Sequence, residues 1–171
     1  MDKTTLNSKF HPIFLVIILV SIGCASNPQQ PEIIAVPLTE AAKRHLHSLA
    51  NQAASKYGID NRLFHALIKH ESAWNPYALS RKGACGLTQI MPKTGHSQCG
   101  LKRNFLFDPK LNLDCGAFYF SKLLRRFRNV KLALAAYNSG ETRVARLGRI
   151  PRIRETQRYV KRVMRSWRQG K

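Results

Sequence analysis

Residues 61 to 73 read NRLFHALIKHESA, and the rest of the sequence is best interpreted outward from this stretch. Its apolar residues recur at helical spacing: Leu63, Phe64, Leu67 and Ile68. Glu71 stands three residues after Ile68, so helical geometry places its carboxylate on the same stripe, facing the core. A glutamate at such a position is paired with a cation, protonated or functional.

The position of Glu71 suits a general acid. Partial burial and the negative end of its helix both raise the pKa of a carboxyl group, which a proton donor working near neutral pH requires. The alternative is a buried ion pair with one of the chain's 29 Lys and Arg residues. Helix geometry alone leaves this alternative open.

Helical spacing continues on both sides of this segment, and no alternating run is long enough to indicate a sheet. Thr39 can cap a helix that ends near Gly58, Asp60 can cap the next, and Asp108 followed by Pro109 starts a core helix. Further helices are predicted over about 130–137 and 155–168, and residues 77–100 are expected to form a structured loop with short helical or extended pieces. The sequence therefore predicts an all-α fold, or an α+β fold with minimal strand content, built from many short helices.

The length and net charge of the chain limit the number of domains and the kinds of partner it can have. A chain of 171 residues, 44% of them hydrophobic, can bury one sizeable core. Its net charge of +20 points to a polyanionic partner such as nucleic acid, acidic lipid or acidic glycan.

The first residues have the layout of a signal peptide, predicted over 1–24, in which Lys3 and Lys9 precede a short apolar run. The run is shorter than a membrane span requires. Cys24 resembles the lipidated cysteine of bacterial lipoproteins, although Ser21 stands where that pattern usually has leucine, so ordinary cleavage after Ala25 remains open. Residues 25–37 are expected to form a flexible linker and 38–171 the domain, with a basic C-terminal helix.

If Cys24 carries lipid, three cysteines remain: Cys85, Cys99 and Cys115. An oxidising compartment would let two of them pair. We favour Cys99 with Cys115, because both flank the loop before a helix while Cys85 lies in a glycine-rich turn. Spacing alone does not settle the pairing.

The sequence offers no metal or cofactor motif. His70 and Glu71 would begin a zinc-protease motif only if position 74 were histidine, and it is Trp74. We therefore expect neither a metal nor a cofactor.

A series of blocks resembles the soluble lytic transglycosylase family between Leu63 and Val163. The blocks stand in the family's order: Glu71-Ser72, Asn75-Pro76, Ser80, Gly83 to Leu87, Gln89 to Pro92, Asp108-Pro109, Asn112-Leu113, Gly116, Ala135 to Gly140, Glu155-Thr156 and Tyr159-Val160. Each block alone is modest evidence, but the whole series in this order is specific to the family.

The resemblance implies a lysozyme-like fold of the goose-type lysozyme kind, with a substrate cleft. It implies that Glu71 protonates the glycosidic oxygen between N-acetylmuramic acid and N-acetylglucosamine in peptidoglycan. The muramyl N-acetyl group would supply the nucleophile that a second carboxylate supplies in most glycosidases. The product would then end in a 1,6-anhydro ring.

The same resemblance assigns the remaining site residues. Ser80 and Gln89 should contact sugar groups, Tyr137 should orient Glu71 or the acetamido group, and Asn138 should bind substrate. Tyr159 is a weaker substrate-binding candidate. Ordinary structural roles compete with these assignments, since Ser80 and Asn138 suit turns and Tyr137 suits the core.

Other functions and partners also need to be weighed. A lysozyme-like muramidase that hydrolyses the same bond is one alternative. A non-enzymatic binding protein for cell wall or nucleic acid is another, because residues 143–171 contain eleven basic side chains and one acid. Export argues against nucleic acid.

The expected location is the periplasm. A lipid anchor at Cys24 would hold the domain on a membrane, and Ala25 in the following position favours the outer membrane. The family resemblance also implies a possible association with secretion or conjugation machinery.

Overall fold

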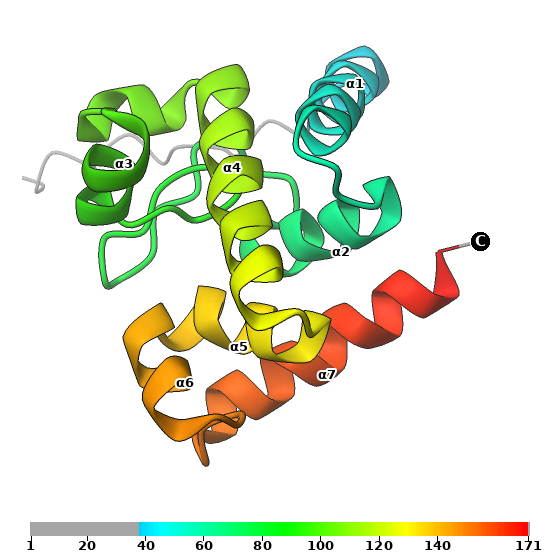
Figure 1. Ribbon diagram of the computed structural model, residues 1–171. Helices are drawn as coiled ribbons and strands as arrows, with labels where there is room; N and C mark the ends of the chain where they lie inside the picture. The colour runs from blue at the N-terminus through cyan, green and yellow to red at the C-terminus, as the bar shows by residue number, and fades with distance from the viewer. Residues whose placement is uncertain (1–37, 171) are drawn as a thin grey trace, which may run out of the picture. The chain divides into compact units, whose positions relative to one another are not determined.

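The computed structural model describes residues 38–170, and every described helix belongs to one domain (Figure 1). The predicted signal peptide, Cys24 and the predicted linker lie outside the described residues. The elements in chain order are α1 (Glu40–Lys56), α2 (Asn61–Ser72), α3 (Pro92–Cys99), the 3-10 helix η1 (Arg103–Phe107), α4 (Pro109–Phe127), α5 (Val130–Ser139), α6 (Glu141–Leu147) and α7 (Arg154–Gln169). None of these helices is long and apolar enough to cross a membrane.

The all-α prediction is confirmed for the described part of the chain, which forms no extended strand. Two isolated antiparallel bridges, from Cys85 to Leu79 and to Ile90, are the only strand-like pairings within residues 38–170. They fold the long segment between α2 and α3 back on itself.

The predicted helix starts are confirmed by their caps. The side chains of Thr39, Asp60 and Asp108 each accept a hydrogen bond from a backbone N–H in the first turn of α1, α2 and α4, at 3.2, 3.0 and 2.8 Å. These bonds satisfy donors that the helix itself leaves without partners. Pro109 follows its cap at a position where a missing N–H costs nothing.

Helices α2, α4, α5 and α7 enclose the core, with α4 running through the centre of the domain (Figure 1). Each contributes at least one fully buried side chain: Phe64, Leu67, Phe120, Leu134 and Val163. Burial of large apolar side chains of this kind is the main stabilising contribution to such a domain. It also holds α2 and α7 side by side.

Helix α6 was not predicted from the sequence. Gly140, at φ 98°, ends α5 and immediately precedes α6. The new helix is seven residues long and buries only Val144. A helix this short has too few apolar positions to show a helical period, so only its tertiary contact reveals it.

The segment between α2 and α3 begins with two left-handed residues that are not glycine. Ala73 and Trp74 have φ values of 51° and 67°. Residues other than glycine rarely adopt this backbone conformation, so the surrounding packing must stabilise it here. The chain turns away from α2 directly after Glu71 and Ser72, which leaves the end of α2 open on one side.

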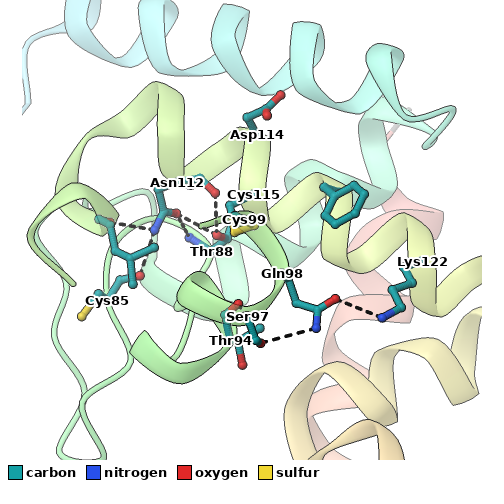
Figure 2. Close-up of a disulfide and its surroundings, with 12 residues drawn as sticks. Cys85, Thr88, Thr94, Ser97, Gln98, Cys99, Asn112, Asp114, Cys115 and Lys122 are labelled. Carbon is teal, nitrogen blue, oxygen red and sulfur yellow. Dashed lines mark hydrogen bonds between the residues drawn. A yellow bond between two sulfur atoms is a disulfide. The ribbon is translucent and has the colours of Figure 1, made fainter. Parts of the chain in front are cut away.

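Asn112 of α4 fastens this segment to the core (Figure 2). Its amide nitrogen donates to the carbonyl oxygens of Cys85 and Leu106 at 3.0 and 2.7 Å, and its oxygen accepts from both the backbone N–H and the hydroxyl of Thr88 at 2.8 and 2.7 Å. Asn112 is 1% exposed. A Cβ atom at Gly86 would lie 2.4 Å from the Asn112 amide nitrogen, so only glycine permits this approach.

A disulfide joins Cys99, at the end of α3, to Cys115 of α4, the pairing that the sequence favoured (Figure 2). The third described cysteine, Cys85, is a buried free thiol. The bridge and the Asn112 bonds hold the segment from 73 to 99 against the same side of α4.

Candidate active site

A cavity of about 480 Å³ opens beside the C-terminal end of α2. Its walls come from α2, the segment between α2 and α3, α5 and α7. The six residues that the sequence proposed for catalysis or substrate binding all line it: Glu71, Ser80, Gln89, Tyr137, Asn138 and Tyr159. Residues up to 88 positions apart thus meet at one cleft.

Glu71 is largely buried at this cleft and makes one close contact. The hydroxyl of Tyr159 donates to its Oε1 at 2.6 Å. Burial raises the pKa of the Glu71 carboxyl from 4.5 to about 7, the hydrogen bond from Tyr159 opposes that rise, and the negative charge of Glu155 adds to it. No ion pair within residues 38–170 includes Glu71, so the buried-ion-pair alternative does not describe this residue.

Tyr159 fixes one side of the carboxyl. It lies on α7, is 2% exposed, and has a pKa well above its ordinary value, chiefly because of burial and then because of the nearby Glu71 charge. The phenol therefore stays protonated and remains a donor across the working pH range. Since Oε1 accepts this bond, a proton on neutral Glu71 is carried by Oε2.

The hydroxyl of Tyr137 is held by the backbone and not by Glu71. Its hydroxyl donates to the backbone carbonyl of Thr88 at 2.8 Å, while the bond to Glu71 comes from Tyr159. The expectation that Tyr137 orients Glu71 or the substrate's acetamido group stays a prediction. Tyr137 nevertheless lines the cleft, and the Glu71 charge contributes to raising the pKa of its phenol.

Ser80, Gln89 and Asn138 each combine a place in the cleft with a structural hydrogen bond. The Ser80 hydroxyl accepts from the Ala84 N–H at 2.9 Å, and the Gln89 amide nitrogen donates to backbone carbonyls within its own loop. The Asn138 oxygen accepts from the Thr156 hydroxyl at 2.9 Å. These bonds fix the side chains in position, and their roles toward a substrate remain predictions.

The cleft also contains residues to which sequence reasoning assigned a weak role or none. Glu155, which belongs to a family block at the start of the last predicted helix, lines the same cavity as Glu71 and lies 4.0 Å from Lys82. His70 also lines it, with Nε2 2.8 Å from the Ser166 hydroxyl. Only the adjacency of His70 to Glu71 hinted at its place. Its position in the helix alone does not separate Glu155 from an ordinary first-turn acid, and only its family block set it apart.

The arrangement is suited to donating and then recovering a proton. Burial raises the pKa of the Glu71 carboxyl, whereas the side chain of Glu155, the other carboxylate that lines the cleft, is 70% exposed. Within residues 38–170 no three side chains come together that could hold a metal ion. The cleft thus combines one tuned acid with neutral hydrogen-bonding groups, and its lining also includes the cations Arg81, Lys82 and Arg162.

A helical domain with a single tuned acid in a cleft belongs to the lysozyme-like class. The structure resembles the 70 kDa soluble lytic transglycosylase of Escherichia coli, with a TM-score of 0.64 and 31% identity over 70% of this chain and 23% of that one. It resembles the lytic transglycosylase Slt of Pseudomonas aeruginosa similarly, with a TM-score of 0.62 and 29% identity over 70% and 22% of the two chains. The predicted lysozyme-like fold is confirmed.

The chain belongs to the Transglycosylase SLT domain family, which matches residues 48–160. Two curated relatives are both named membrane-bound lytic murein transglycosylase C. The one from Mannheimia succiniciproducens is 35% identical over 68% of this chain and 37% of its own length. The one from Photorhabdus laumondii is 36% identical over 64% and 35%. The chain thus spans little more than a third of the length of these relatives.

Proposed function

We propose that this protein is a peptidoglycan lytic transglycosylase that cleaves the β-1,4 bond between N-acetylmuramic acid and N-acetylglucosamine. The observation that carries the proposal is Glu71, whose pKa is raised to about 7 in a cleft where no second buried carboxyl faces it. Membership of the family and the names of the relatives support the substrate class.

In the first step the Glu71 proton passes from Oε2 to the glycosidic oxygen as the bond from that oxygen to C1 of the muramyl sugar breaks. The carbonyl oxygen of the sugar's own acetamido group bonds to C1, forming an oxazolinium ion. The hydrogen bond from Tyr159 stabilises the Glu71 carboxylate that remains.

In the second step Glu71 acts as the base. Its carboxylate takes the proton from the C6 hydroxyl, whose oxygen bonds to C1 as the oxazolinium ring opens. The product is a 1,6-anhydro sugar, no water is consumed, and Glu71 is protonated again. One carboxyl group thus serves both steps because the substrate supplies the nucleophile and the second oxygen.

The test is digestion of purified sacculi followed by mass spectrometry of the muropeptides. We expect anhydro-muropeptides from the native protein, and from Glu71→Gln a loss of turnover of at least about a thousandfold with wall binding retained. Reducing muropeptides would instead establish the muramidase alternative. If neither the native protein nor Glu71→Gln shows detectable turnover, the protein binds the wall without cleaving it.

We further propose that the enzyme is held on the periplasmic face of the outer membrane through lipid on Cys24. The signal-like N-terminal sequence and the word membrane-bound in the relatives' names support this. Labelled palmitate should be incorporated by the native chain and not by Cys24→Ala. Label retained in that variant, or a native chain that fractionates with soluble proteins, would contradict the anchor.

The small size of the domain and the family resemblance also support a role in opening the wall for a secretion or conjugation apparatus. Removing the protein should then reduce secretion or conjugative transfer. The native chain should restore it and Glu71→Gln should not. Restoration by Glu71→Gln would show that any such role does not depend on wall cleavage.

A further inference from the structure

A second and larger hollow, of about 700 Å³, lies between α7, the start of α5 and the connection that precedes α7. We call it the basic groove. Four exposed cations line it: Lys131, Lys161, Arg165 and Arg168. Its apolar lining comes from Ile150, Val160 and Met164. No carboxylate lines the groove.

The groove cations have no acidic partner within residues 38–170. That part of the chain contains seven carboxylates, of which five pair with other cations. The remaining two, Glu71 and Asp108, accept hydrogen bonds from Tyr159 and from the backbone of Leu111. The positive charge of the groove is therefore uncompensated by the folded domain.

The spacing of these cations adds repulsion. Lys161 and Arg165 are four residues apart on α7, and Arg168 follows three residues later, so all three lie along one face. Like charges at these spacings destabilise a helix. An anionic ligand in the groove would relieve that repulsion. It would also be attracted by all three positive charges at once.

The apolar lining restricts what that ligand can be. Val160 is buried, and Ile150 and Met164 are partly buried, beneath the cations. A lipid bilayer presents a plane of head groups and a nucleic acid presents phosphates, and neither fills a concave hollow with apolar side chains. An amphipathic helical segment does, because its apolar residues can enter the hollow while its acidic residues meet the cations.

We propose that the basic groove is a docking site for an acidic amphipathic helix of a partner protein. The groove uses the face of α7 that carries Lys161 and Met164, whereas the cleft uses the face that carries Tyr159 and Arg162. A partner bound in the groove leaves the cleft open to substrate. The groove thus positions the domain without inhibiting it.

The probe is a fluorescent 18-residue peptide with leucine and phenylalanine along one helical face and glutamate on the other. Its control is a scrambled peptide of the same composition. Anisotropy is measured with the full chain at about 0.15 M salt, where long-range attraction is largely screened. We expect the amphipathic peptide to bind at least about tenfold more tightly than the scrambled one, because only it matches both the charges and the apolar lining.

Matched variants locate the binding. Replacing Lys161, Arg165 and Arg168 together by glutamine should weaken binding of the amphipathic peptide at least about tenfold. The control variant replaces Lys93, Lys110 and Arg146, three exposed cations outside the groove, and should change binding less than about twofold. Both variants lose three charges, so net charge alone cannot separate them. Met164→Gln should remove the preference for the amphipathic peptide over the scrambled one.

Several results would overturn the proposal. Equal losses in the two triple variants, or equal binding of the two peptides, would mean that only net charge is recognised. Binding to vesicles of phosphatidylglycerol that is lost in the groove variant, without a matching loss for the peptide, would assign the groove to a membrane. Circular dichroism and thermal melting of each variant show whether a loss reflects unfolding instead.

Discussion

Glu71 is tuned by two neighbours that act in opposite directions. Tyr159 stabilises the carboxylate by a hydrogen bond of 2.6 Å and so lowers the pKa, while the charge of Glu155 raises it. Burial has the largest effect on the Glu71 pKa and raises it to about 7 in spite of the hydrogen bond from Tyr159. The proposed reaction needs the protonated form at the start, so activity should fall as pH rises through this value.

Two single substitutions should therefore shift the pH profile in opposite directions. In Tyr159→Phe the carboxylate loses its donor, so the alkaline limb of kcat against pH should move to higher pH, and the maximum rate should fall about tenfold or more. In Glu155→Gln a negative charge is lost, so the same limb should move to lower pH. The measurement is release of soluble muropeptides from pH 4 to pH 9. Shifts in the same direction would contradict these assignments.

The raised pKa of Glu71 also has a consequence for stability. A carboxyl whose folded-state pKa lies above its unfolded value stabilises the fold at low pH, and this contribution is lost as pH rises from about 4.5 through about 7. Glu71→Gln removes the ionisation, so it should raise the free energy of unfolding at pH 8 by about 2 to 3 kcal/mol. Near pH 4 the two proteins should unfold at similar urea concentrations. A pH-independent difference would mean that glutamine acts through packing instead.

At the scale of elements, the side of the cleft that carries Ser80 and Gln89 depends on Asn112. This one side chain makes four hydrogen bonds that bring the segment after α2 onto α4. Asn112→Ala leaves the Leu106 carbonyl and the Thr88 N–H without a partner in a buried site. The Cys85 carbonyl keeps its bond from the Ile90 N–H, and the Thr88 hydroxyl can still donate to the backbone carbonyl of residue 112.

We expect Asn112→Ala to lower the free energy of unfolding by at least about 2 kcal/mol, because each of the two buried polar groups left unpaired costs about 1 to 3 kcal/mol. Asn104→Ala removes an exposed asparagine and serves as the control, with an expected change below about 0.5 kcal/mol. Urea unfolding followed by circular dichroism measures both. Similar losses in the two variants would argue against the role given to Asn112.

The helices could be predicted from the sequence because their signals are local. Thr39, Asp60 and Asp108 mark helix starts by chemistry that acts within one turn. The stripe on α2 likewise placed Glu71 toward the interior. The contact between Glu71 and Tyr159 joins residues 88 positions apart, and no local pattern reveals which of two tyrosines makes it. The effect of Glu155 on Glu71 and the presence of α6 could not be predicted for the same reason, since tertiary packing decides both.

For the whole molecule, the disulfide closes a loop of 16 residues that carries η1 and part of the support for the cleft. A loop of this length should contribute roughly 3 kcal/mol by restricting the unfolded chain. Dithiothreitol should therefore lower the melting temperature, and Cys99→Ser with Cys115→Ser should reproduce that loss. Cys85→Ala should remain sensitive to the reductant, because it leaves the bridge intact. A melting temperature that reductant leaves unchanged would contradict this contribution.

The cleft is assembled from both ends of the described domain. Glu71 lies on α2, and its hydrogen-bond partner lies on α7, the last of the described helices. Ribosomes make α2 well before α7, and a domain generally folds as a unit. A nascent chain that lacks α7 therefore holds its acid without the phenol that positions it. The order of synthesis keeps the cleft incomplete until the final helix has been delivered and packed.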